Sequence, residues 1–251
     1  MTALDAPARK RDRAGFVPTI GQWFEDHPEW LILTIAALAW IPLLWTLAGT
    51  FTLDHHHGPA AAPEPIGGYD THLAMWSMMA VAMMLPTTVP HLRYIGFGTR
   101  VSRRQRSILL FALSYLTAWT LPGFAIALVP QPAAPVAVVI AVLFAAGWEL
   151  TPVKRRALRA CCRTSPVRYR GPVADSAAAE YGLRHGGRCL LGSGPAMIAL
   201  MLGGHPWWAT VALALVMAGQ KLLSEPVRWQ TVVALGWLGA ALAVTGVALF
   251  D

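Results

Sequence analysis

Charged residues are scarce in this chain. Only 13% of its 251 residues are charged, whereas 55% are hydrophobic. Soluble globular domains carry about 25% charged residues, so the composition excludes an ordinary soluble domain and indicates a membrane protein. The formal net charge of +7 is then best explained by membrane topology and contact with anionic lipid, not by nucleic-acid binding.

Cysteine and the common catalytic motifs are also scarce. The chain has three cysteines, Cys161, Cys162 and Cys189, and no CxxC pair, which argues against a zinc site or a dithiol redox centre. It contains no Walker A loop, no dinucleotide-binding fingerprint and no HExxH motif, each of which would supply a specific chemistry. These absences predict a protein that is not an enzyme.

Long apolar runs are what the chain has in abundance. A helix that crosses a bilayer needs about 20 apolar residues, and the sequence has no alternating pattern typical of a membrane barrel. We therefore expect an all-α bundle of about seven transmembrane helices in one domain, residues 30–251, after a basic N-terminal segment, residues 1–29. The seven runs lie near residues 30–50, 70–91, 107–129, 134–152, 187–203, 206–223 and 230–249.

The positive charges are confined to alternate gaps between these runs. Lys and Arg are absent from the gaps 51–70, 129–134 and 203–206. Cytoplasmic loops of membrane proteins are rich in Lys and Arg, so this pattern predicts a cytoplasmic N-terminus and an extracytoplasmic C-terminus. It makes residues 51–70 an outer loop and the basic residues 153–186 an inner loop.

The outer loop has a metal-binding composition. It contains three adjacent histidines, His55, His56 and His57, together with three carboxylates. Imidazole and carboxylate suit Cu(II), Zn(II) or Ni(II). Because three consecutive residues cannot all bind one ion in a fixed geometry, we interpret the segment as a loop that captures metal. A solvated polar loop is the alternative.

The second apolar run carries a stripe of metal-ligating residues. At 100° per residue, His72, Met75, Met79 and Met83 fall on one helix face. Thioether sulfur is soft and selects Cu(I), and the imidazole accepts copper in either oxidation state. Methionine also fills gaps in apolar cores, so packing is the alternative. Pro86 and Pro90 should break this helix and free carbonyl groups beside the site.

Six further residues are weaker candidates for metal binding. The adjacent cysteines Cys161 and Cys162 lie in a cationic neighbourhood that should favour thiolate and soft-metal capture. Glu149 and His91 would lie near the inner membrane face, either as one end of an ion route or as interfacial groups that pair with Lys154. The remaining two candidates are Met84 and Cys189.

Three stretches of sequence resemble a known family. They are Trp-x-x-Met-x-x-x-Met-Met-Leu-Pro at 76–86, Trp-Glu-Leu-Thr-Pro-x-Lys at 148–154, and Gly-Leu-Arg-His-Gly-x-Arg-Cys-Leu at 182–190. Together they are similar to a bacterial family of predicted metal-binding integral membrane proteins, which includes copper chaperones for polyphenol oxidase. The resemblance covers residues 69–222.

The resemblance implies copper handling at the bacterial cytoplasmic membrane, with delivery to an extracytoplasmic or membrane cuproenzyme. By position it implicates Met79, Met83, Met84, Glu149 and Cys189. The chain departs from the family after Cys189, where a richer cysteine group is common, and before Lys221, where an acidic residue is common.

The hypothesis is therefore a copper chaperone in the lipid bilayer. It captures copper at the outer His loop and His72 and holds it along the methionine stripe. Transport of copper across the membrane is one alternative, and a non-metal assembly subunit of a membrane complex is another. The sequence gives neither the client enzyme nor the oligomeric state.

Overall fold

The structure, a computed structural model, describes residues 20–53, 69–129, 134–164, 173–204, 206–222 and 230–250. Throughout these ranges the regular structure is helical, without strands, so the predicted all-α class is confirmed. The α-helices are α1 (Ile20–Asp26), α2 (Trp30–Leu53), α3 (Tyr69–Met79), α4 (Val89–Gly98), α5 (Arg104–Ile126), α6 (Pro135–Glu149), α7 (Pro152–Cys161), α8 (Ala174–Leu202), α9 (Trp207–Leu222) and α10 (Gln230–Phe250).

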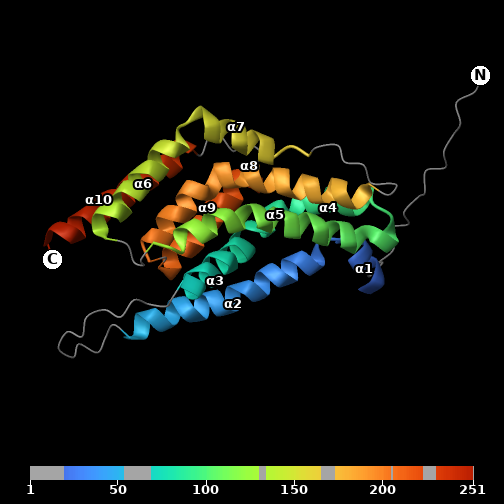
Figure 1. The fold of residues 1–251 in the computed structure, drawn as a ribbon, viewed down its shortest axis with the longest axis horizontal. Coiled ribbons are helices and arrows are strands. Elements are labelled where there is room, and N and C mark those ends of the chain that lie inside the picture. The colour runs from blue at the N-terminus through green and yellow to red at the C-terminus, as the bar shows by residue number, and fades with distance from the viewer. Residues whose placement is uncertain are drawn as a thin grey trace, which may run out of the picture.

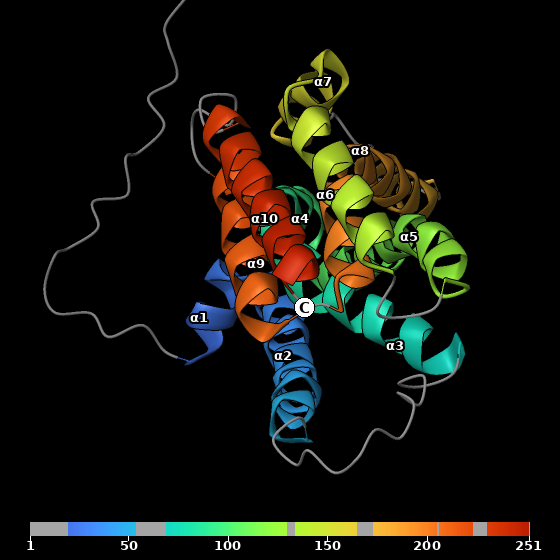
Figure 2. The same ribbon diagram turned by 90° about the vertical axis from the view of Figure 1, so that its left-hand side faces the viewer.

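Helices α5 and α8 form the centre of the bundle, and they pack along each other more extensively than any other pair. Helix α10 packs on α6, and α6 and α7 both contact α8. In both ribbon views α7 and α2 lie on opposite sides of the molecule (Figures 1 and 2). The buried core is continuous across α2 to α5, the end of α7, α8 and α9.

Two glycines allow α5 and α8 to approach closely. A Cβ on Gly182 would overlap the carbonyl oxygen of Phe111, and a Cβ on Gly186 would lie 2.7 Å from the carbonyl oxygen of Tyr115. Small residues at such positions let two helix backbones meet. The α5 residues opposite these glycines are therefore held against α8.

The second predicted helix is interrupted where its prolines lie. Helix α3 leads into a π-helical turn, η1 (Ala80–Met84), and a 3₁₀ turn, η2 (Pro86–Thr88), before α4 begins at Val89. The hydroxyl of Thr87 donates to the carbonyl of Met84, as expected where irregular backbone leaves acceptors free. Isolated π turns occur frequently at functional sites.

Membrane-crossing potential is clearest in two helical segments. By length and apolar composition, the continuous helical segments Tyr69–Gly98 and Val101–Ile126 could each span a bilayer. A third candidate is α6 with α7, which are bent by 69° relative to each other. The described residues thus contain two or three candidate spans of this kind, and the seven-span topology stays a prediction.

The basic segment 153–186, which the sequence predicts as an inner loop, is helical over most of its described residues. It contains α7 and the first half of α8. Arg103 and Arg106, which precede or begin α5, both pair with Asp175 at the start of α8, at 2.8 and 2.7 Å. Polar residues continue α8 well beyond its apolar half, because one face of that polar half still packs on α5.

A short connection joins α8 to α9. Helix α8 ends at Leu202, and α9 begins at Trp207. Gly204 adopts a positive φ of 73°, a conformation that residues with a Cβ rarely adopt. The turn therefore returns α9 towards the core beside α8.

Candidate metal site

A buried thiol and a buried thioether converge on one lysine. Cys189 on α8 and Met84 at the end of the π turn are both completely buried. The ammonium of Lys221, one residue before the end of α9, donates to Cys189 Sγ at 2.8 Å and to Met84 Sδ at 3.4 Å. Three segments that are far apart in the sequence thus bring two soft donors to a single point, which we call the sulfur site.

Tyr115 adds a hydroxyl group to the sulfur site. Its OH lies 2.9 Å from Cys189 Sγ, and its side chain is fully buried on α5. The Tyr115 backbone lies against Gly186, one turn before Cys189 on α8. The close approach of the two helices therefore fixes the distance between this hydroxyl and the thiol.

Two buried imidazoles lie beside the sulfur site. The rings of His91 and His185 have their centroids 4.0 Å apart. His91 uses both of its nitrogens, with Tyr181 OH at 2.6 Å and the Cys161 carbonyl at 2.7 Å. His185 is 3% exposed, and its Nδ1 is buried with no hydrogen-bond partner in the part of the chain that the structure describes.

His91 is held by hydrogen bonds at both ring nitrogens, whereas His185 Nδ1 has no partner among the described residues and could accept or bind one. A buried polar nitrogen without a partner costs free energy, and such a group in a native structure calls for an explanation. His185 precedes Cys189 by four residues on α8, so both side chains lie on one face of the helix. The His185 ring also lies 5.6 Å from the Tyr115 ring.

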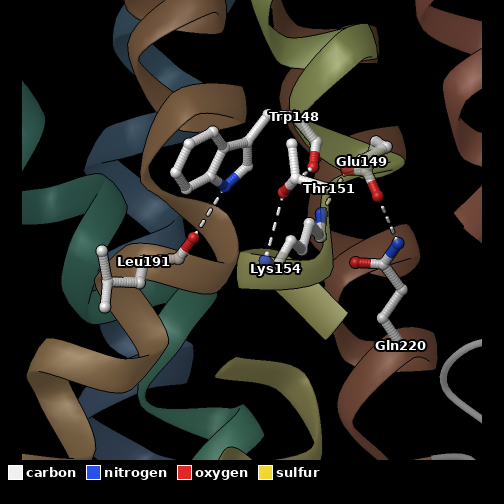
Figure 3. A network of polar contacts seen from close by, with 6 residues as sticks. All are labelled: Trp148, Glu149, Thr151, Lys154, Leu191 and Gln220. Carbon is white, nitrogen blue, oxygen red and sulfur yellow. Dashed lines mark hydrogen bonds and ion pairs between the residues drawn. The ribbon is translucent and has the colours of Figure 1, made fainter. Parts of the chain in front are cut away.

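A second polar network joins α6, α7 and α9 next to the sulfur site (Figure 3). Glu149 and Lys154, both almost fully buried, form an ion pair across the bend between α6 and α7. The amide of Gln220 donates to the other oxygen of Glu149 at 3.2 Å. Because Gln220 precedes Lys221, this bond anchors the end of α9 that carries the ammonium.

Local capping makes the bend that holds this network. Thr151 is the N-cap of α7, and its hydroxyl accepts a hydrogen bond from the backbone N–H of Lys154. Pro152 follows at the first helical position, where proline is favoured. On the other face, the indole N–H of Trp148 donates to the Leu191 carbonyl of α8 (Figure 3).

The predicted His–Met stripe faces the protein interior. His72 is 9% exposed, Met75 is partly buried, and Met79 and Met83 are buried in the core. A π turn contains more residues than an α turn, so the 100° spacing fails beyond Met79. Met84 is the methionine that contacts Lys221.

The other predicted site residues are separated. His55, His56 and His57 lie outside the described residues. Cys161 is buried and Cys162 is exposed, so the two adjacent thiols do not face one point. Desolvation raises the pKa of Cys162, and the charge of Lys221 lowers it by less.

Carboxylates, imidazoles and thiols alone do not form a metal site in the described ranges. Within them, no three His, Cys, Asp or Glu side chains are grouped closely enough to hold an ion. At the sulfur site the thiol of Cys189 is accompanied by the thioether of Met84, a residue type outside that set. A thiol with a thioether is a soft donor pair of the kind that selects Cu(I).

The sequence matches a family model over most of its length. The PpoB2 copper chaperone family matches residues 73–249. The chain belongs to this family. No curated protein and no solved structure matches the chain. The resemblance noted in the sequence is confirmed, and membership of the PpoB2 family supports a role in copper handling in general.

The PpoB2 match includes every residue of the sulfur site and both imidazoles next to it. His72 and the outer histidines precede the matched range. Sequence reasoning did not select His185, Lys221 or Tyr115 as site residues. A signal existed for His185, because it is four residues from Cys189 in a predicted helical stretch. No sequence pattern would have brought Lys221 and Tyr115 to the same sulfur.

Proposed function

We propose that this PpoB2 family member is a copper chaperone embedded in the bacterial cytoplasmic membrane. It binds Cu(I) at the sulfur site and passes the ion to an extracytoplasmic or membrane cuproenzyme. The observation that carries the proposal is the convergence of the Cys189 thiol and the Met84 thioether on one buried point that a cation already occupies.

The donor set supports Cu(I) as the cargo. Thiolate and thioether sulfur prefer Cu(I) over harder ions. His185 Nδ1, buried and unpartnered among the described residues, is available as a third ligand, and an imidazole is compatible with copper in either oxidation state. Burial of Cys189 and Met84 would also keep water and oxidants away from bound Cu(I).

The route to the site extends the proposal towards the outer face. With the predicted seven-span topology, copper enters at His55, His56 and His57, moves to His72, and then follows Met75, Met79 and Met83 to Met84. What supports this route is the interior position of the described part of the stripe and the absence of Lys and Arg from residues 51–70. Copper transport through the bilayer is the second candidate, because such a stripe descends through a candidate span.

Cu(I) binding by the purified full-length protein tests the proposal. Detergent-solubilised wild type, Cys189→Ser and Met84→Leu compete for Cu(I) with a chromophoric chelator. We expect one tight site in the wild type, its loss in Cys189→Ser, and weaker binding in Met84→Leu. Circular dichroism and size-exclusion profiles check that each variant is folded.

Matched substitutions control for the loss of sulfur elsewhere. Met201→Leu removes another thioether that is completely buried on α8, and Cys162→Ser removes an exposed thiol. Both should bind Cu(I) as the wild type does. Equal binding by the wild type and a folded Cys189→Ser variant would rule out the sulfur site as the copper site.

A further inference from the structure

The two buried or partly buried lysines near the sulfur site have different partners. Lys154 is 1% exposed and is neutralised by Glu149. Lys221 is partly buried, and no Asp or Glu among the described residues forms an ion pair with it. Its ammonium instead donates to two sulfur atoms.

Sulfur atoms are unusual hydrogen-bond acceptors for a lysine ammonium. A Lys side chain has donors only, and a thioether is a weak acceptor, so the two contacts compensate poorly for a partly desolvated charge. The same two sulfurs are the soft donors expected for Cu(I). The ammonium carries one positive charge, as Cu(I) does, and lies within 3.4 Å of both donors.

We propose that Lys221 is the resident cation of the sulfur site and that copper and the lysine ammonium replace each other there. The inference rests on the proposed copper function. When Cu(I) enters, two N–H···S hydrogen bonds break and copper–sulfur bonds form at Cys189 and Met84. Copper stays Cu(I), Lys221 keeps its protons and its charge, and any proton on Cys189 leaves to water.

The position of Lys221 allows this exchange. It lies one residue before the end of α9, and Leu222 next to it is exposed, so a long side chain can extend to solvent without a helix moving. Gln220 keeps the backbone of this helix end in place through Glu149. The return of the ammonium would weaken copper binding and promote release, which a chaperone requires.

Two substitutions of Lys221 separate its charge from its length. Lys221→Gln removes the charge and should tighten Cu(I) binding by roughly tenfold or more, because a unit charge so near the ion no longer opposes it. It should also slow the transfer of bound copper to excess chelator. Lys221→Arg keeps the charge and should stay within about threefold of the wild type. Arg184→Gln removes a charge from the exposed face of α8 and is the control for net charge.

The results distinguish this inference from the proposed function. Tighter binding and slower release in Lys221→Gln, with Arg184→Gln unchanged, support the exchange. Unchanged or weaker binding in a folded Lys221→Gln variant overturns the role of Lys221, while loss of copper in Cys189→Ser still supports the site. If the wild type itself binds no Cu(I), or Cys189→Ser binds as tightly, both proposals fail.

Discussion

Glu149 and Lys154 face each other across the bend where α6 gives way to α7, and each side chain is 2% exposed. In a straight helix, two residues five positions apart lie on different faces. The bend of 69° between α6 and α7 instead brings the carboxylate and the ammonium together. Gln220 ties the same carboxylate to α9. One ion pair therefore links the bend to the helix that carries Lys221.

The first prediction concerns the stability of this pair. Lys154→Met should destabilise the protein by about 3–5 kcal/mol, because it leaves a buried carboxylate without its partner. The double variant Glu149→Met with Lys154→Met should regain most of that loss. Thermal unfolding in detergent measures both, with Arg159→Gln on the exposed face of α7 as control. A double variant no more stable than the single one would contradict the pairing.

The second prediction concerns the contact between α5 and α8. Gly186→Ala should cost about 1–3 kcal/mol by overpacking, since its Cβ would lie 2.7 Å from the Tyr115 carbonyl oxygen. Gly187→Ala is the matched control on the next residue, where a Cβ meets nothing within 4 Å. That change should be neutral or stabilising by up to about 1 kcal/mol, because alanine favours a helix. Equal losses from both substitutions would mean that the helices do not meet at Gly186.

The third prediction separates the two histidines. His91→Leu should lower stability by about 1–3 kcal/mol, since Tyr181 OH and the Cys161 carbonyl lose their partner. His185→Leu removes a nitrogen that has no partner among the described residues, so stability should change little while Cu(I) affinity falls. Unfolding curves and chelator competition on the same preparations provide both readouts. A His185→Leu variant with normal copper binding would remove His185 from the ligand set.

The fourth prediction concerns the thiols. Among the three, only Cys162 is exposed, so a maleimide should label one cysteine per native chain and none in Cys162→Ser. Because the pKa of Cys162 is raised, labelling should be slow at neutral pH and accelerate in the alkaline range. In oriented vesicles, an impermeant maleimide should reach Cys162 only from the cytoplasmic side. Labelling from the outer side would contradict the proposed orientation.

The fifth prediction tests the route through the methionine stripe. A triple variant, His72→Ala with Met75→Leu and Met79→Leu, should load copper more slowly when Cu(I) is offered to the outer face of proteoliposomes. Its equilibrium binding at the sulfur site should be unchanged. Loading is followed by the copper content of the recovered protein over time. A folded triple variant that loads at the wild-type rate would identify the stripe as packing only, and copper inside the vesicle lumen would favour transport over chaperoning.

The fold was largely accessible from the sequence because apolar run length and proline position are local properties. Each of the seven predicted runs overlaps a described helix, and the break near Pro86 and Pro90 lies where the π and 3₁₀ turns occur. The polar half of α8 was not predicted. Its residues look like a loop by hydropathy, and only packing on α5 through Gly182 and Gly186 explains why they continue the helix.

The site was less accessible because tertiary contacts and an irregular turn decide it. A stripe drawn at 100° per residue places Met83 in line with Met79, but the π turn changes that register, and Met84 is the residue at the sulfur site. Tyr115, Cys189 and Lys221 belong to three helices, and their meeting depends on how those helices pack. No spacing rule within one segment could bring them together.

The close contact between α5 and α8 at Gly182 and Gly186 also affects how an ion could reach the sulfur site. Because Gly182 and Gly186 let the backbones of α5 and α8 approach closely, Tyr115 and Cys189 lie on the most closely packed pair of helices and are held next to each other. In the proposed exchange, the access of Cu(I) to the sulfur site would then depend on rotations within the Lys221 side chain at the end of α9 and not on the sliding of helices.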